Sequence, residues 1–450
     1  MTEHESLWRN WGRSESVTPV RRERPQSADE VAALIRRARD EGLSVKPVGT
    51  SHSFSGIAVA PGIQIDMSGL TGLVRSRGTE VTLGAGTVLH DLPPILEPLG
   101  LALQNMGDID VQTLSGATAT GTHGTGAKFG GLATRITGAT LVTGTGDILT
   151  IGSGQNSSGK SDPGEDGPGE NADLLPAVSV GLGALGVLVD LTIDCVPSFR
   201  MRLVETPEPL GVVLDEWQDR LAAADHFEFY WFPHTDIALT KTTTRLPADA
   251  ELRPLSAARR WFDDSFMSNT VFALSTTVQH RFPKSTPGIN RFSTRLTGDR
   301  EFTDQSHRTF ATERRVRFRE MEYAIPQEQI PDALREIDAL IERKGWTISF
   351  PVEVRAAAAD DLWLSTASGR ATGYIAVHRY YRDDQREYFE AVEAIMMAHD
   401  GRPHWGKMNH RAAADLAPAY PHFADFLAVR DRLDPDRVFA NPYLERVLGA

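Results

Sequence analysis

The sequence predicts a globular protein of the α+β class with two domains. Its 450 residues are 40% hydrophobic and 24% charged, which is ordinary for a soluble chain with room for two cores. Short strands and helices alternate in the first half, as they do in α+β or α/β domains. Aromatic-rich stretches begin near residue 200 and indicate the start of a second domain.

The first elements follow from helix caps and apolar spacing. We expect a helix over 27–42, because Ser27 and Glu30 form a capping box and Gly42 can end it. Its apolar side chains recur on one face, as an amphipathic helix requires. Strands are expected at 43–48, 62–67 and 80–83, and a short helix is expected at 91–99.

The later elements follow a long polar break. Residues 152–171 hold no apolar side chain larger than proline, so we expect them to form a disordered surface loop. Beyond the break, 187–195 alternates as a strand, 327–345 has the spacing of an amphipathic helix, and 347–355 is expected to form a strand.

Composition argues against several classes of function. The net charge of −13 is unfavourable for binding nucleic acid, and no apolar run is long enough to span a membrane. Residues 1–24 lack the apolar core of a secretory signal, so a cytoplasmic location is expected. A single cysteine, Cys195, excludes an internal disulfide and a cysteine-based zinc cluster, and we expect no metal centre.

Two loops of small residues predict a site for an anionic ligand. The run VGTSHSFS at 48–55 follows an apolar strand, and the run SGATATGTHGTG occupies 115–126. Glycine and serine let the backbone approach a ligand closely, so that several N–H groups can donate to it. His52 lies in the first loop, where its imidazole could contact the ligand or bond to it.

The string GLGALG at 181–186 matches the dinucleotide-binding pattern GxGxxG by letter only. In a nicotinamide-binding fold, that pattern follows a strand and opens a helix. A predicted strand follows it here, so we interpret it as a tight turn whose backbone could touch another cofactor.

The strand FPVEVR at 350–355 is the strongest catalytic candidate in the second half. Strand alternation places Glu353 and Arg355 on one face, and Val352 and Val354 on the other, toward a core. The alternative is a solvated strand face with an ion pair, which usually contributes little to stability.

Two isolated side chains, His378 and Lys407, are further catalytic candidates. His378 lies in a predicted strand at 374–378, where a lone histidine is more often structural than catalytic. Lys407 follows a glycine in the run PHWGK, and an exposed lysine is the simpler interpretation there.

Taken together, these segments resemble the aldonolactone oxidases and dehydrogenases of the vanillyl-alcohol-oxidase-like flavoprotein group, of which the alditol oxidases are close relatives. The similarity runs nearly end to end, and the order and spacing of the segments make it specific. The segments are GTSHSFSGIA (49–58), VTLGAG (81–86), GLALQNMGDID (100–110), SGATATGTHGTG (115–126), SVGLGALGV (179–187), RVRFREMEYAIP (315–326), FPVEVR (350–355), GRPHWGK (401–407) and LDPDRVFANPY (433–443).

The resemblance implies a two-domain α+β fold of the VAO/PCMH type. It implies an FAD-binding domain over 1–200, with the polar loop of about 152–171 inserted in it. A cap domain for the substrate, built on an antiparallel sheet flanked by helices, is expected over 201–400. Residues 401–450 are expected to return to the FAD-binding domain.

The resemblance also implies FAD as cofactor. In many members the loop histidine is bonded to the 8α-methyl carbon of the flavin, and His52 matches it, so covalent attachment is expected there. A second covalent bond would need a cysteine near the second loop, and Cys195 lies elsewhere. The positions that match cofactor contacts are Gly49, Thr50, Ser51, His52, Ser53, Gly107, Asp108, Thr113, Gly116, Ala119, Thr120, Gly121, Thr122, His123, Val187 and His404.

The substrate-binding and catalytic positions of the family match Glu353, Arg355, His378 and Lys407. Arg355 and Lys407 suit the stabilisation of negative charge on the substrate oxygen and on reduced flavin, and Glu353 suits the orientation of Arg355. The base that takes the hydroxyl proton is left open between His378 and an uncharged Lys407.

Two positions depart from the alditol oxidases. Asp108 stands where they have serine, and His378 stands where they have threonine. Gly107 matches a position beside the flavin where side-chain size governs the access of oxygen, and a glycine leaves that path open.

The expected activity is oxidation of the C2 hydroxyl of a sugar 1,4-lactone (L-gulono-, L-galactono- or D-arabinono-) by hydride transfer to FAD N5, which gives an ascorbate-type product. The alternatives are an alditol oxidase that makes an aldose and hydrogen peroxide, and a flavin-binding module without turnover. The expected partners are a small lactone or polyol and an electron acceptor, either oxygen or a cytochrome-type protein.

Overall fold

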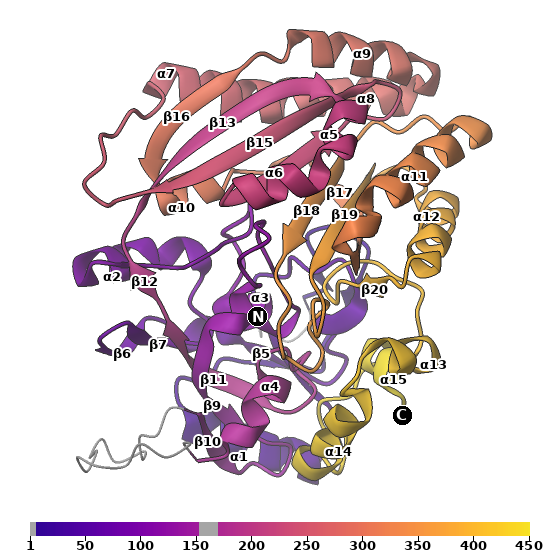
Figure 1. Ribbon diagram of the computed structural model, residues 1–450. Helices are drawn as coiled ribbons and strands as arrows, with labels where there is room; N and C mark the ends of the chain where they lie inside the picture. The colour runs from indigo at the N-terminus through magenta and orange to yellow at the C-terminus, as the bar shows by residue number, and fades with distance from the viewer. Residues whose placement is uncertain (1–5, 153–169) are drawn as a thin grey trace.

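The computed structural model describes residues 6–152 and 170–450. The predicted disordered loop of 152–171 lies outside them, apart from its ends. Within the described residues the strands form five sheets (Figure 1). None of the described helices is long and apolar enough to cross a membrane.

The strands are β1 (Trp8–Arg9), β2 (Ser16–Val17), β3 (Arg21–Glu23), β4 (Val45–Val48), β5 (Ile63–Asp66), β6 (Leu73–Arg77), β7 (Glu80–Gly84), β8 (Leu101–Ala102), β9 (Ile136–Val142), β10 (Ile148–Gly152), β11 (Val187–Asp194), β12 (Val196–Pro197), β13 (Arg200–Pro209), β14 (His226–Trp231), β15 (Ile237–Leu246), β16 (Arg300–Gln305), β17 (Phe318–Pro326), β18 (Val352–Ala357), β19 (Thr372–Tyr380) and β20 (Arg402–Pro403). The α-helices are α1 (Ala28–Asp40), α2 (Pro93–Leu96), α3 (Leu114–Ala119), α4 (Leu175–Val178), α5 (Leu210–Asp215), α6 (Trp217–Ala223), α7 (Ala257–Arg260), α8 (Phe272–Arg281), α9 (Thr286–Leu296), α10 (Ser306–Phe310), α11 (Ile330–Lys344), α12 (Arg386–Ala398), α13 (Ala413–Leu416), α14 (Phe423–Leu433) and α15 (Pro442–Leu448).

A small parallel sheet in the order β3–β5–β4 carries the first loop of the candidate site. Helix α1 connects β3 to β4, and its Ser27 side chain accepts from the Glu30 backbone N–H, which confirms the predicted cap. Strand β4 ends at Val48, immediately before the loop that contains His52.

A five-stranded antiparallel sheet in the order β10–β9–β11–β7–β6 forms the rest of the first half. The turn at 181–186 leads directly into β11, which confirms that the GxGxxG string does not open a helix. Buried apolar residues from 31–201 and from 405–448 form one core, so the C-terminal helices α14 and α15 pack with the first half. On the strength of this packing we propose the domain limits near residues 200 and 400.

An eight-stranded antiparallel sheet, in the order β16–β13–β15–β14–β18–β19–β17–β20, dominates the second half. Because side chains alternate along a strand, Phe227, Phe229 and Trp231 of β14 share one face, and Glu228 and Tyr230 point to the other. The apolar face packs on α5, α6, α11 and α12 in a second core, to which Val352 and Val354 also belong (Figure 1). The charged face is therefore left to build a site.

Two expected elements differ from the structure because of proline. The strand expected at 347–355 begins only at Val352, since Pro351 has no N–H to donate to a sheet ladder. The helix expected at 91–99 is one turn, α2, between two 3₁₀ turns, and Pro98 removes another N–H that a longer helix would need.

Glu393 on α12 provides a test of stability outside the candidate site. Its buried carboxylate accepts from the His410 N–H at 2.9 Å, from Arg411 Nη2 at 2.9 Å and from the Tyr323 hydroxyl. Burial alone would raise the pKa of Glu393, but the bonds from His410, Tyr323 and Arg411 outweigh it and lower the pKa to about 2.

We expect Glu393→Gln to lower the free energy of unfolding by roughly 2–4 kcal/mol at pH 7. Because folding lowers the pKa from 4.5 to about 2, this stabilisation is complete above about pH 4.5 and is lost as the pH falls toward 2. Urea unfolding of both proteins at several pH values measures the difference. A difference that stays constant down to pH 2 would contradict this account.

Candidate active site

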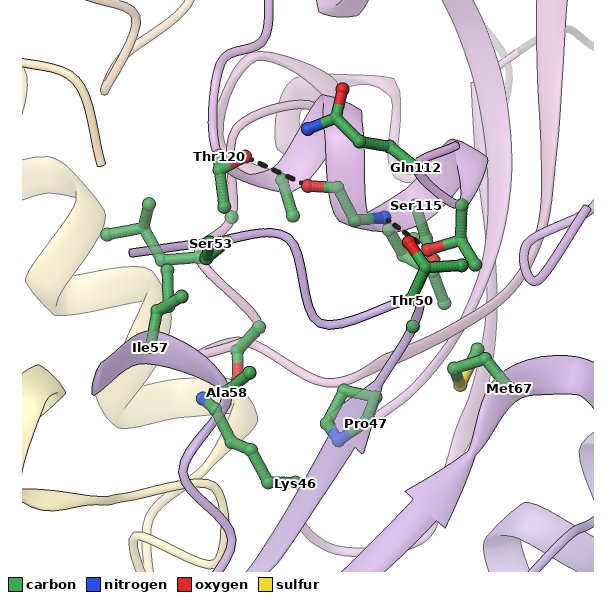
Figure 2. A pocket seen from close by; sticks show the side chains of 18 of the residues that line it. Lys46, Pro47, Thr50, Ser53, Ile57, Ala58, Met67, Gln112, Ser115 and Thr120 are labelled. Carbon is green, nitrogen blue, oxygen red and sulfur yellow. Dashed lines mark hydrogen bonds between the residues drawn. The ribbon is translucent and has the colours of Figure 1, made fainter. Parts of the chain in front are cut away.

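Two adjoining cavities lie between the first half and the charged face of the eight-stranded sheet. The first, which we call the narrow end, lies between the loop at 49–53, the start of α3 and the turn at 181–186 (Figure 2). The second is a chamber of about 380 Å³. The narrow end and the chamber share four lining residues, His52, Ser53, Gln112 and Thr120.

The loop at 49–53 presents its backbone N–H groups to the narrow end. Ser51 holds a left-handed conformation with φ of +64°. Trp8 Nε1 donates to its hydroxyl at 2.9 Å, and the Trp11 N–H donates to its carbonyl at 2.8 Å. The N–H groups of residues 50–53 donate to no acceptor within 6–152 and 170–450. A row of free N–H groups in such a loop forms a concavity suited to an anion.

The start of α3 lies directly against this loop. The Thr113 hydroxyl caps α3 by accepting from the Gly116 N–H. A Cβ added at Gly49 would lie 2.2 Å from Thr113 Oγ1, and one added at Gly116 would lie 2.8 Å from the same atom. Glycine at position 49 therefore lets the first loop approach the start of α3, and glycine at 116 leaves room for the Thr113 cap.

Lys46 lies at the far end of the narrow part and was missed from the sequence (Figure 2). Its buried Nζ donates to the Gly183 carbonyl at 2.9 Å and to the Phe439 carbonyl at 3.3 Å. Burial, together with the nearby Arg430, lowers the pKa of Lys46 to about 7. A single lysine in the apolar strand VKPV was the available signal.

These features fit FAD. The free N–H groups and small side chains of the narrow end suit a diphosphate. The chamber beside His52 offers room for a ring system next to charged side chains.

The structure brings most of the predicted cofactor positions to these cavities. Gly121 and Val187 line neither of them. Gly121, at φ +77°, turns the chain after α3, and Val187 is fully buried in the core, while its neighbours Gly186 and Leu188 reach the narrow end. The narrow end includes Gly49, Thr50, Ser51, His52, Ser53, Thr113, Gly116, Ala119 and Thr120, and the chamber includes Gly107, Asp108, Thr122, His123 and His404.

The four predicted catalytic residues line the same chamber. Glu353 and Arg355 lie on β18, His378 lies on the adjacent β19, and Lys407 follows β20. The side chains of Glu353, Arg355 and His378 project from the charged face of the sheet, opposite the core.

Arg355 is the centre of a buried charge cluster. It pairs with Glu353, its Nε donates to Glu228 Oε2 at 2.8 Å, and its Nη2 lies 3.3 Å from Asp108 Oδ1. Burial alone would lower the pKa of Arg355, but the surrounding carboxylates raise it well above its usual value. Glu353 and Arg355 are each only 7% exposed, so the alternative of a solvated ion pair is wrong.

The cluster has further polar and charged partners that the sequence analysis did not identify. Tyr230 donates to Glu353 at 2.9 Å, Lys241 contacts Glu228 at 2.8 Å, and Arg314 Nη2 contacts Asp108 at 2.5 Å. The alternation of charged and apolar residues in HFEFYW at 226–231 was the signal for Glu228 and Tyr230.

A second buried cluster joins Lys407, Glu320 and His378. Lys407 Nζ donates to Glu320 Oε2 at 2.5 Å, and His378 Nε2 lies 3.6 Å from Glu320 Oε1. Burial alone would lower the pKa of Lys407, but Glu320 and Glu322 raise it above its usual value. These carboxylates favour the charged form of Lys407, which makes His378 the stronger candidate for the base.

The two ring nitrogens of His378 face different oxygens. Its Nδ1 lies 2.9 Å from the Pro351 carbonyl, which can only accept, so Nδ1 carries a hydrogen, and its Nε2 faces Glu320. Glu320, missed from the sequence, lies directly opposite His378 in the β17–β19 ladder. Burial alone would raise its pKa, but Lys407 and His378 lower it to about 2, so Glu320 is ionised beside both.

His123, Glu322 and His404 form another wall of the chamber. His123 Nδ1 lies 2.9 Å from the Gly124 carbonyl and its Nε2 lies 3.0 Å from Glu322 Oε1. One potential ligand atom from each of the three residues lies within 4.8 Å of the others. His404 Nδ1 already accepts from the Gly406 N–H at 3.0 Å. Because His123 and His404 already have hydrogen-bond partners, these residues form a hydrogen-bonded wall of the chamber.

Comparisons with known proteins define the class first. Residues 21–152 match the family model described as "FAD binding domain". The crystal structure of cholesterol oxidase from B. sterolicum superposes with a TM-score of 0.75 at 17% identity and covers all of this chain and 98% of that one. A structure described as a solvent-stable cholesterol oxidase gives the same TM-score at 18% identity, over 99% of this chain and 98% of that one. The chain is an FAD-binding flavoprotein with the two-domain α+β fold of the VAO/PCMH group.

The second half defines the family. Residues 191–447, more than half of the chain, match the model described as "D-arabinono-1,4-lactone oxidase". The L-gulono-1,4-lactone dehydrogenase of Mycobacterium tuberculosis is 41% identical over 98% of this chain and 99% of its own length. The L-gulonolactone oxidase of Bos taurus is 34% identical over 98% of both chains. This chain belongs to the D-arabinono-1,4-lactone oxidase family.

Proposed function

We propose that the protein oxidises the C2 hydroxyl of a sugar 1,4-lactone and that the product is a 2-keto lactone, which enolises to an ascorbate-type compound. The observation that carries the proposal is the meeting of Glu353, Arg355, His378 and Lys407 around one chamber, next to His52. Family membership and the names of the relatives support the lactone as substrate.

The chamber residues divide the chemistry between them. His378 Nε2 accepts the hydroxyl proton, and the ionised Glu320 beside it stabilises the imidazolium that results. Arg355 and Lys407 stabilise the negative charge that develops on the substrate oxygen in a site shielded from water. When bound, FAD supplies the two-electron oxidant that takes the hydride.

Glu353 and Arg355 also orient the lactone. Burial raises the pKa of Glu353, although Arg355 partly offsets this effect. Glu353 accepts from both Arg355 and Tyr230, and these bonds hold the guanidinium plane in one direction. A fixed guanidinium fork suits two neighbouring oxygens, such as a hydroxyl and a ring oxygen.

The alditol alternative has less support. The M. tuberculosis and Bos taurus relatives, at 41% and 34% identity, are named for lactones. Asp108, which replaces the serine of alditol oxidases, is paired with Arg355 and Arg314.

Product analysis tests the proposal. Protein loaded with FAD is incubated with L-gulono-, L-galactono- and D-arabinono-1,4-lactone and with xylitol, in the presence of oxygen or of cytochrome c as acceptor. We expect an ascorbate-type product from at least one lactone. An aldose from xylitol, with no product from any lactone, would refute the proposal. The comparison of acceptors decides whether the path beside Gly107 serves oxygen.

We also propose that FAD is covalently attached through His52. Burial, together with the nearby Lys407, lowers the pKa of His52 to about 4, so the imidazole is uncharged and nucleophilic at neutral pH. The bond would join an imidazole nitrogen of His52 to the 8α-methyl carbon in place of one N–H bond and one C–H bond. The two protons would be released to water, and the two electrons would pass to the acceptor used in turnover.

Replacing His52 with alanine should release the flavin. After acid precipitation, we expect the yellow colour to stay in the wild-type pellet and to appear in the supernatant of His52→Ala. The N–H groups of the loop remain in the variant, so it should still bind FAD before acid is added. Wild-type flavin that is already soluble in acid would exclude the covalent bond.

A further inference from the structure

The outer helices of the second half expose an unusual number of apolar side chains. They comprise α7, a π-helical segment at Trp261–Val271, α8 and α9, and Figure 1 shows α9 at the edge of the molecule. Within 6–152 and 170–450, eight of the sixteen exposed large apolar side chains lie between residues 261 and 296. Exposure is greatest at Leu274 (66%), Phe282 (63%), Phe292 (63%) and Leu296 (62%).

The two long helices of this region are inverted relative to an ordinary surface helix. The buried residues of α8 are Thr276 and Gln279, and those of α9 are Thr286 and Asn290. Several of their apolar residues are exposed instead, and their spacing of four places them in a stripe along each helix, with Leu274 and Val278 on α8 and Phe292 and Leu296 on α9. A surface helix normally buries its apolar stripe, so this outward face is built to contact another apolar phase.

Charge distinguishes between possible occupants of this surface. Residues 265–298, which we call the outer helical face, hold Arg281, Lys284, Arg291 and Arg295 and no acidic residue, in a chain of net charge −13. A symmetric pairing of two copies would bring these cations against each other. The acidic residues just before the face are already paired, Asp263 with Arg259 and Asp264 with Arg300. The face therefore calls for a partner that is apolar and anionic.

We propose that the outer helical face docks on an anionic lipid bilayer. The leucine and phenylalanine side chains enter the boundary between headgroups and acyl chains, and the arginine and lysine side chains contact the headgroup phosphates. The protein lies on the bilayer without crossing it. Ser268 and the buried Asn269 of this face also line the chamber, so the face adjoins the candidate active site. This inference does not depend on the identity of the substrate.

Vesicle co-sedimentation of the FAD-loaded protein tests the proposal. We expect binding to phosphatidylcholine vesicles that contain about a quarter phosphatidylglycerol, and binding at least about tenfold weaker to phosphatidylcholine alone or at high salt. The variant with Leu274, Phe282, Phe292 and Leu296 all changed to serine should lose binding. Changing Arg291 and Arg295 to glutamate should remove the preference for anionic vesicles.

A matched control changes Leu73 and Val74 to serine, because these residues of β6 are also exposed (48% and 58%) but lie in the first half. It should bind vesicles like the wild type. All the substituted positions are exposed, and unchanged thermal unfolding and flavin absorbance show that each variant is folded. Two results would overturn the proposal. One is a wild type that sediments with neither kind of vesicle, and the other is a dimer that the serine variant dissociates, which would make the face an interface between copies.

Discussion

Arg355→Met is expected to slow anaerobic flavin reduction by a lactone by about 10²–10³-fold, the usual loss when a donor to a developing oxyanion is removed. In the structure Arg355 is the shared cation of Glu353, Glu228 and Asp108. Methionine fills similar space but leaves the substrate oxygen and all three carboxylates without that cation. Stopped-flow absorbance of the FAD band measures the rate directly.

In Arg355→Met, a loss of folding stability must be distinguished from a loss of catalysis. Removing one partner of a buried ion pair costs about 3–5 kcal/mol, so Arg355→Met should also unfold more easily. Glu393→Gln serves as the matched control, since it breaks a buried charge network away from the chamber and should reduce flavin at the wild-type rate. Arg355→Lys keeps the charge without the fork and should give an intermediate rate. A full rate in Arg355→Met would remove Arg355 from the mechanism.

Lys407→Met is expected to lower the same rate by about 10²-fold or more, because the second cation of the chamber is lost. Glu320 would keep only His378 as a partner, and its pKa should rise. Lys344→Met, which breaks an exposed pair with Glu387, is the control and should leave the rate unchanged.

The pH dependence distinguishes a cationic Lys407 from a basic one. Its pKa is raised above its usual value by Glu320 and Glu322, so we expect the lysine to stay protonated across the working range. The wild-type rate should therefore not rise with deprotonation of Lys407 between pH 7 and about 10. An increase over that range that is absent in Lys407→Met would make the lysine a base and would contradict this account.

Local patterns in the sequence predicted those parts of the structure that depend on neighbouring residues. The Ser27 cap, the strand at β11 and the opposite faces of Glu353 and Val354 are all confirmed. Each depends on caps or on a period of two, which a short window of sequence contains.

The missed residues depend on pairing between distant strands. Glu228 reaches Arg355 through the register of β14 with β18, and Glu320 reaches His378 through that of β17 with β19. No local pattern specifies such a register, because strand order is set by the packing of the whole sheet. The protonation of Lys407 could not be predicted for the same reason, since it depends on a carboxylate 87 residues away.

The most direct test of the account is one anaerobic mixing experiment with wild-type protein whose FAD content is known. L-Gulono-1,4-lactone and xylitol are added separately, and the flavin absorbance is followed until it is stable. We expect the lactone to bleach the flavin and xylitol to leave it oxidised. Bleaching by xylitol alone, or no bleaching by any aldonolactone in fully loaded protein, would contradict the account.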